Sequence, residues 1–322
     1  MAFELVARMA LTRPTMHLGV EMWKYAKSLK LRDVDPEVGH RHRPNAQRIL
    51  MGVDVRTNSL GLRDVERQRD KPAATYRILV LGDSITFGWG VAFEKTFCQL
   101  VESSLNTDPP IPGCRFEVLN AGVGNLNTAM EVAYLKHAGV HLQPDLVLLA
   151  WFINDAEPPP VPRRGWLARH SYAYVWLDSA SDSAMRRLIG RQDYRDYYTG
   201  LYRDENPGWT RCKHALRDLA AVCRDRGIPC RVLMIPELHS LGSAYEFRDV
   251  HDAVRRVCRQ AGLPVLDLLE ALPAVADARR YWVSPDDAHP NAEANDLLAR
   301  AIDSDVRRAL HFGNVYPPSP NE

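Results

Sequence analysis

Ser84, Asp286 and His289 are the residues whose types and order in the chain best suit nucleophilic catalysis. A serine hydroxyl is a poor nucleophile until a base takes its proton, and a histidine can do so near neutral pH. The imidazolium that forms then needs a fixed carboxylate to hold its tautomer. In "SPDDAHPNAEAN", Asp286 and His289 are three residues apart, which places both side chains on one side of a helical turn. The sequence therefore predicts Ser84 as nucleophile, His289 as base and Asp286 as acid.

The oxyanion of an acyl-transfer intermediate needs hydrogen-bond donors that are fixed in advance. The backbone N–H of Ser84 is one candidate, and an N–H in the turn 122–125 of "VLNAGVGNLNT" is a second. The side-chain amide of Asn154, in "WFINDA", is a third. Losing one such donor typically costs about 3–4 kcal/mol of barrier. We therefore expect these three segments to meet around one reacting carbonyl.

The same residues follow apolar runs that are typical of buried parallel strands. "RILVL" precedes Gly82-Asp83-Ser84, "FEVLN" precedes the glycine turn, and "DLVLLAWF" leads to Asn154. In parallel α/β sheets the ligand lies beyond the carboxyl ends of the strands. Each stretch alone is explained by turn or capping chemistry, and Asp83 is expected to order the turn around Ser84. Their occurrence together and in this order favours a reaction centre.

Strands and helices alternate regularly from Tyr76 onward, which predicts a doubly wound α/β fold with a parallel sheet covered on both faces. We expect an N-terminal extension at 1–74 packed on the main domain, which spans 75–312. An insertion at about 157–209, opening with "EPPPVPRRGW", either shapes the pocket or is a surface elaboration. Residues 313–322 are expected to form a flexible tail.

The four stretches resemble, in order, the conserved blocks of the SGNH/GDSL hydrolase superfamily. The resemblance covers about Tyr76 to Leu310, apart from the insertion, and implies a flavodoxin-like three-layer α/β/α domain with esterase, lipase, thioesterase or carbohydrate acylesterase activity. It implies no metal and no cofactor. The family's nucleophile, oxyanion asparagine, acid and base are carried over to the following residues: Ser84, Asn154, Asp286 and His289. Asp287 does not have the spacing of the family pattern.

Two departures from the family pattern affect the pocket. Glycine usually precedes the Asn-Asp pair, whereas Phe152 and Ile153 stand here, so a bulkier wall is expected to narrow the pocket. Counted from Asn120 without a gap, the family's oxyanion glycine falls on Asn125, one residue beyond Gly124. We choose Gly124 and keep Asn125 as the alternative. Asp83, Asn125 and Trp151 are further candidates for the pocket, although packing explains Trp151 equally well.

The charge balance of the sequence argues against one class of partner. Lys plus Arg (41) nearly balance Asp plus Glu (40), which argues against nucleic acid as a partner.

The partner we expect is a small-molecule or glycan ester. Serine hydrolysis of an ester or thioester is the leading hypothesis; an acyltransferase with the same triad and a catalytically silent binding or scaffold protein are the alternatives. The Gly-x-Ser-x-Gly motif of α/β-hydrolases is incomplete, because Thr86 occupies its last position.

The N-terminal segment raises the question of a membrane. The charged residues Glu4 and Arg8, together with Pro14, interrupt every apolar run of this segment, so we expect neither a signal peptide nor a membrane-spanning helix. We therefore expect a cytoplasmic protein, in which the six cysteines are reduced. Met22, Ala26 and Leu29 share one helical face, with lysines opposite. This pattern fits a helix lying on a membrane surface or one packed on the main domain, and we favour packing because the pattern is short.

Overall fold

The computed structural model describes residues 2–11, 18–160, 165–188, 191–239, 241–242, 245–275 and 277–312. The tail predicted at 313–322 lies outside this part of the chain. Among the described residues, none of the helices combines the length and apolar character that crossing a bilayer requires.

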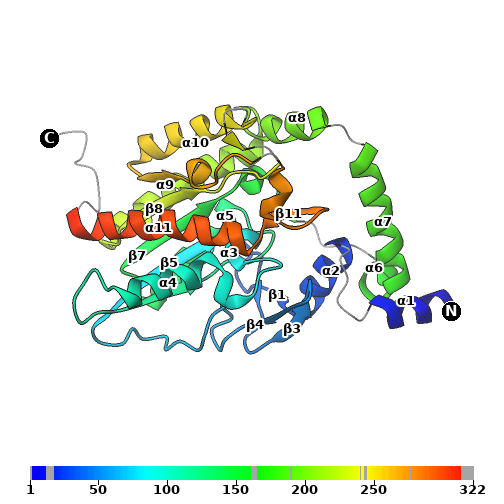
Figure 1. The fold of residues 1–322 in the computed structure, drawn as a ribbon, viewed down its shortest axis with the longest axis horizontal. Helices are drawn as coiled ribbons and strands as arrows, with labels where there is room; N and C mark the ends of the chain where they lie inside the picture. Colours follow the sequence, from blue (N-terminus) through cyan, green and yellow to red (C-terminus); the bar gives the residue numbers. More distant parts are fainter. Residues whose placement is uncertain are drawn as a thin grey trace.

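A five-stranded parallel sheet forms the centre of the molecule (Figure 1). Its strands lie in the order β6-β5-β7-β8-β9, the 2-1-3-4-5 order of flavodoxin-like folds. Their bounds are β5 (Thr75–Gly82), β6 (Arg115–Asn120), β7 (Leu146–Trp151), β8 (Cys230–Met234) and β9 (Val265–Asp267). Every residue of β7 is buried, as a central parallel strand covered on both faces requires. The predicted fold class is confirmed.

Helices cover both faces of this sheet (Figure 1). On one face lie α5 (Thr128–His137), α9 (Pro207–Asp225) and α10 (Arg248–Ala261); on the other lie α4 (Phe97–Thr107) and α11 (Ala292–Phe312). Side chains of alternate residues in β5 enter the two cores: Leu79 and Leu81 one, Ile78 and Val80 the other. The sheet is therefore held rigidly between two apolar layers, and its carboxyl edge is a fixed platform.

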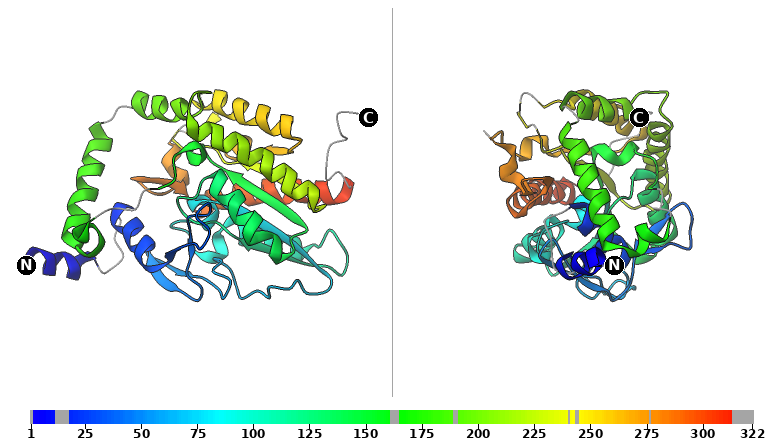
Figure 2. Two further views of the ribbon diagram at one scale, coloured as in Figure 1. Left: turned by 180° about the vertical axis from the view of Figure 1, so that it is seen from behind. Right: turned by 90° about the vertical axis from the view of Figure 1, so that its right-hand side faces the viewer.

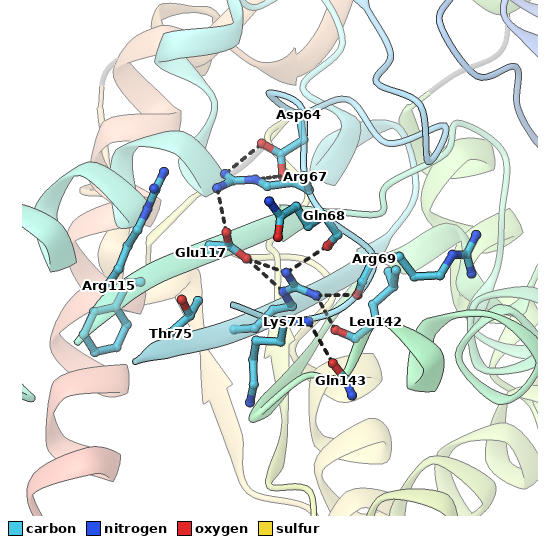
Figure 3. Close-up of polar contacts among 12 residues, drawn as sticks. Asp64, Arg67, Gln68, Arg69, Lys71, Thr75, Arg115, Glu117, Leu142 and Gln143 are labelled. Carbon is cyan, nitrogen blue, oxygen red and sulfur yellow. Dashed lines mark hydrogen bonds and ion pairs between the residues drawn. The ribbon is translucent and has the colours of Figure 1, made fainter. Parts of the chain in front are cut away.

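A buried ion network fastens the amino end of the sheet to the segment that precedes it (Figure 3). Arg77 of β5 and Glu117 of β6 are register partners, and Nε of Arg77 lies 2.9 Å from Oε2 of Glu117. The Arg77 guanidinium also donates to the carbonyl of Leu142 at 2.6 Å. Arg67 pairs with Asp64 at 2.9 Å and lies 3.7 Å from Glu117. Because each buried charge has an opposite partner, removing one member would leave an uncompensated charge, which ties the strand register to this network.

The described residues before β5 form two helices and two small hairpins. Their bounds are α1 (Ala2–Leu11), α2 (Leu18–Ser28), β1 (Lys30–Arg32), β2 (His40–His42), β3 (Gln47–Leu50) and β4 (Val53–Arg56). Tyr25, Leu29 and Leu50 pack against Phe87 and Trp89, which directly follow the Ser84 turn. The N-terminal segment is thus in direct contact with the chain around the predicted nucleophile.

The predicted apolar face is confirmed at Met22 and Leu29, which pack in the cluster around Phe87. It is wrong at Ala26 and in placing both lysines on the opposite, solvent-facing side. Ala26 is exposed, while Glu21 and Lys24 are 0% and 3% exposed and form an ion pair of 2.7 Å. The second carboxylate oxygen of Glu21 accepts the backbone N–H of Met51 at 2.9 Å. The pattern misled because a mutual ion pair lets these two charges lie inside, beside Val20 and Tyr25.

The described residues between β7 and α9 form a short 3-10 helix and the α-helices α6 (Trp166–His170), α7 (Tyr172–Leu188) and α8 (Arg191–Leu201). Figure 2 shows α7 at one side of the molecule next to α1, and α1 and α2 both contact α7. Glu4 of α1 accepts the backbone N–H of Ala173 at 3.0 Å, so a distant carboxylate caps the start of α7. At the other end, α8 contacts the short 3-10 helix Ile153–Ala156, which carries Asn154.

Candidate active site

Ser84 lies where β5 ends and the one-turn helix α3 (Ser84–Phe87) begins. A side chain at Gly82 is excluded, because a Cβ there would lie 2.1 Å from Oγ1 of Thr86. Asp83 caps α3, and its carboxylate accepts the Ile85 N–H at 2.9 Å. The cap fixes Ser84 at the first helical position, where its backbone N–H has no acceptor within the helix. The serine is thus held rigidly at the carboxyl edge of the sheet, 7% exposed.

His289 reaches Ser84 from the hairpin formed by β10 (Trp282–Ser284) and β11 (Asp287–Pro290). Oγ of Ser84 lies 2.8 Å from Nε2 of His289, and Nδ1 of His289 lies 2.5 Å from Oδ1 of Asp287. An ionised carboxylate only accepts hydrogen bonds, so Nδ1 carries the proton and Nε2 is free to accept from the serine hydroxyl. The three side chains form a continuous Ser–His–Asp relay.

The carboxylate of this relay belongs to Asp287, and the prediction of Asp286 is wrong. The expectation rested on a helical turn, in which residues three apart share a side. The chain is instead a strand from Asp287 to Pro290, and in a strand residues two apart share a face. Asp287 and His289 therefore lie on the same face. Asp287 is buried, whereas Asp286 is exposed in the turn between the two strands.

Burial and charge act in opposite directions on His289. Desolvation alone would lower its pKa, but the hydrogen bond and charge of Asp287, with a contribution from Asp83, raise the pKa of His289 above its ordinary value of 6.5. Burial would raise the pKa of Asp287, and its bonds to His289 and Trp89 hold that pKa below 3.8. The pair therefore favours an ionised Asp287 beside a His289 whose pKa lies above its ordinary value.

Asn154 lies beside Ser84 through a shared contact with Asp83. Nδ2 of Asn154 donates to Oδ2 of Asp83 at 2.9 Å, and the same oxygen lies 3.4 Å from Oγ of Ser84. An amide nitrogen carries two hydrogens, so this bond orients Asn154 and leaves one N–H for a ligand. Asp83 is 1% exposed, so it positions its neighbours from beneath the site.

The glycine turn offers a different donor from the one predicted. The N–H of Gly124 donates to Oη of Tyr25 at 2.8 Å, so it is already used. Asn125 has the left-handed conformation, with φ +65°, and its N–H makes no hydrogen bond within the described part of the chain. Gly122 brings this turn close to α3, since a Cβ there would lie 2.3 Å from the Phe87 nitrogen. Of the two candidates, Asn125 is therefore the one whose N–H is available to a ligand, and its role as an oxyanion donor stays a prediction.

Two of the three bulky residues at the end of β7, Trp151 and Ile153, lie in the core. Trp151 is 0% exposed and packs edge-on against Tyr202 and His251 in the core, so the prediction that it lines a pocket is wrong. Ile153 is 1% exposed in the same core. Phe152 is partly buried between the two cores on either side of the sheet.

Two aromatic residues of the site were missed by sequence reasoning. Nε1 of Trp89 donates to Oδ2 of Asp287 at 3.0 Å, and Tyr25 holds the Gly124 N–H. The glycines on either side of Trp89 in "FGWGV" mark a tight turn close to Ser84, which is a weak signal. Tyr25 carries no signal in the sequence, because its contact joins residues 99 positions apart.

One surface cluster has the composition of a cation site. Among the described residues, Asp35, Glu37 and His137 are the only group of three potential ligands whose donor atoms lie within 4.8 Å of one another. His137 Nε2 lies 2.9 Å from Asp35 Oδ2, an ordinary ion-pair distance. None of the relay residues belongs to this cluster.

Comparison with known proteins agrees with this geometry. The model of the GDSL-like lipase/acylhydrolase family matches residues 80–297, which include Ser84, Asn154, Asp287 and His289. The chain belongs to this family. The segment that carries Tyr25 lies before the matched residues. No curated protein gives a significant sequence match.

Several solved structures align with the chain. A two-domain esterase active on acetylated mannans aligns at 17% identity and TM-score 0.46, over 77% of this chain and 53% of the esterase, so the chain spans about half its length. TesA aligns at 17% identity and TM-score 0.45, over 70% of this chain and 95% of TesA. The lipase/acylhydrolase from Enterococcus faecalis aligns at 16% identity and TM-score 0.43, over 76% of this chain and 98% of that enzyme.

Proposed function

We propose that the protein is a serine hydrolase that cleaves a carboxylic ester or thioester through an acyl-enzyme. The observation that carries the proposal is the relay of 2.8 Å and 2.5 Å that joins Ser84, His289 and Asp287. These distances match the reach of a nucleophile–base pair and of a base held by its carboxylate.

Each residue has a defined role in the two half-reactions. Nε2 of His289 takes the Ser84 proton as Oγ attacks the substrate carbonyl, and Asp287 stabilises the imidazolium. The oxyanion receives hydrogen bonds from the backbone N–H of Ser84, the free N–H of Asn154 and the backbone N–H of Asn125. The imidazolium protonates the departing alcohol or thiol, which leaves Ser84 acylated. His289 then takes a proton from water, whose oxygen attacks the acyl carbonyl, and returns that proton to Ser84.

A fluorophosphonate probe tests this proposal directly. The folded wild-type protein should be labelled at Ser84, and Ser84→Ala should be neither labelled nor active toward p-nitrophenyl esters. A chain-length series of p-nitrophenyl and thioester substrates then measures the preferred acyl group. Absence of labelling and of hydrolysis by folded wild-type protein would refute the assignment.

A further inference from the structure

Four residues of the N-terminal segment hold the peptide groups on either side of Gly124. They are Tyr25 from α2, Lys30 from β1, and His40 and His42 from β2, and we call them the N-terminal clamp. All four precede the GDSL domain match. The clamp contacts both the N–H and the carbonyl of Gly124 in the turn that follows β6.

One half of the clamp fixes the Gly124 N–H. This N–H donates to Oη of Tyr25 at 2.8 Å, and the Tyr25 hydroxyl lies 2.7 Å from Nε2 of His42. Burial lowers the pKa of His42 to about 3, so its ring is neutral. A chain of hydrogen bonds thus runs from Gly124 through Tyr25 to His42.

The other half fixes the Gly124 carbonyl. The ammonium group of Lys30 donates to this oxygen and also to Oδ1 of Asn125 at 3.0 Å. Nε2 of His40 lies 3.0 Å from the same carbonyl oxygen. Since a carbonyl only accepts, His40 must carry its proton on Nε2. Burial, assisted by the charge of Lys30, lowers the pKa of His40 to about 4, so the ring is a neutral donor.

The Gly124 carbonyl and the Asn125 N–H belong to one peptide unit. In a trans peptide the N–H points opposite to the C=O, so two donors on the oxygen also set the direction of the N–H. The cationic donor withdraws electron density from the amide and makes its N–H a stronger donor. The same contacts hold Asn125 at φ +65°, a conformation that is unfavourable for most side chains.

We propose, on the basis of the function proposed above, that Lys30 and His40 are positioning residues that aim and polarise the Asn125 N–H toward the oxyanion. The N-terminal segment then completes the active site. An oxyanion donor acts in the transition state, so losing its support should lower kcat and leave KM almost unchanged.

The protonation of Lys30 should be visible in the pH profile. Burial lowers the pKa of Lys30 to about 7, and the charge of Asp83 opposes this shift. The groups that face the ammonium are the Tyr25 ring, the Gly124 carbonyl, His40, Asn125 and, through longer-range charge interactions, His42 and Asp83. Above pH about 7 the amine is neutral and polarises the peptide less. The wild-type kcat should therefore decline on the alkaline side.

Four variants test the proposal with p-nitrophenyl acetate as substrate. Lys30→Met should lower kcat roughly 10- to 100-fold with little change in KM, and His40→Ala should lower kcat less, because each removes one support of an oxyanion donor. Lys30→Arg, which keeps its charge, should move the alkaline decline to higher pH. Lys27→Met is the matched control, since Lys27 is exposed on α2 and should leave all parameters unchanged.

Fluorophosphonate labelling of Ser84 and a thermal melt accompany each assay. If wild-type protein is neither labelled nor active, the proposed function itself fails. The positioning role is refuted if wild-type protein is active and the folded variants Lys30→Met and His40→Ala have the same kcat and the same alkaline decline as wild type. If Lys30→Met does not fold, the more exposed His40→Ala and the pH profile of Lys30→Arg decide the matter.

Discussion

Trp89 donates its indole N–H to Oδ2 of Asp287 at 3.0 Å, the carboxylate oxygen that His289 does not contact. The two oxygens of Asp287 thus have separate tasks, one holding the imidazole and the other anchoring the carboxylate to a tryptophan that is 1% exposed. Tyr25 packs edge-on against the same indole, with ring centroids 5.6 Å apart. The acid of the relay is therefore supported by the N-terminal segment as well as by the GDSL domain.

Replacing the two adjacent aspartates separately should distinguish their roles. Asp287→Asn removes the charge that holds Nδ1–H of His289, so kcat should fall by up to roughly 10⁴-fold. Asp286→Asn alters an exposed carboxylate of the turn and should leave kcat within about twofold, as surface changes usually do. Steady-state hydrolysis of p-nitrophenyl acetate measures both. Equal losses in the two variants, or a larger loss in Asp286→Asn, would contradict the geometry.

The raised pKa of His289 predicts the acid limb of the activity profile. Only the neutral imidazole can take the Ser84 proton, so kcat/KM should fall as pH drops through a midpoint above 6.5. In Asp287→Asn the supporting charge is lost while burial remains, so the residual activity should titrate at lower pH than in wild type. The pH dependence of kcat/KM in both proteins measures the shift. A midpoint that does not move would mean that Asp287 does not act on His289.

The strands and their carboxyl-edge residues were predictable because local signals specify them. Apolar runs such as that of β7 indicate a buried parallel strand, and parallel strands bring residues at their ends to one edge. Ser84 and Asn154 follow such strands directly, so their placement needed no knowledge of distant contacts. His289 was found because its residue type, order and motif were distinctive.

The misassigned residues depend on information that is not local. Choosing between Asp286 and Asp287 required knowing that the chain is a strand there, and a three-residue spacing suggested a helical turn. Choosing between Gly124 and Asn125 required knowing that Tyr25, far earlier in the chain, takes the Gly124 N–H. The buried charges of α2 likewise follow from a mutual ion pair, which hydrophobic periodicity does not detect.

Asn125 and Asn154 should respond differently to loss of the side chain. Asn125→Gly keeps the backbone N–H and removes the left-handed strain, worth up to about 1 kcal/mol, while losing one hydrogen bond to Lys30. The kcat of Asn125→Gly should stay within about threefold of the wild-type value. Removal of an oxyanion donor lowers kcat far more than this. Asn154→Ala removes a side-chain donor and should lower kcat by roughly 10²- to 10³-fold. Measured kcat values in the opposite order would show that the Asn125 side chain, and not its N–H, serves the reaction.

The ion pair inside α2 predicts a large stability change. Lys24→Met leaves the carboxylate of Glu21 buried without this partner, which should lower the free energy of unfolding by about 3–5 kcal/mol. Adding Glu21→Leu should recover part of the loss, because replacing both charges removes the uncompensated one. Urea denaturation of the single and double variants measures the effect, with exposed Lys27→Met as control. A change below about 1 kcal/mol in Lys24→Met would indicate a solvated pair.

Glu131 of α5 predicts how stability depends on pH. It is 1% exposed, and neither carboxylate oxygen has a hydrogen-bond partner among the described residues. Burial, then the charges of Asp155 and Asp83, raise the pKa of Glu131 well above 4.5, so the folded protein binds this proton more tightly than the unfolded chain does. The contribution of Glu131 to the free energy of unfolding is therefore fully present below pH about 4.5, and it is lost as the pH rises through the folded-state pKa of Glu131.

Glu131→Gln removes this proton and keeps the side-chain shape, so the free energy of unfolding should decline less steeply with pH. One fewer titrating group reduces the slope by up to about 1.4 kcal/mol per pH unit. Denaturation at several pH values on either side of neutrality measures the two slopes, and the variant should be the more stable protein at the alkaline end. Identical slopes would mean that Glu131 ionises alike in the folded and unfolded states, which its burial beside Asp155 opposes.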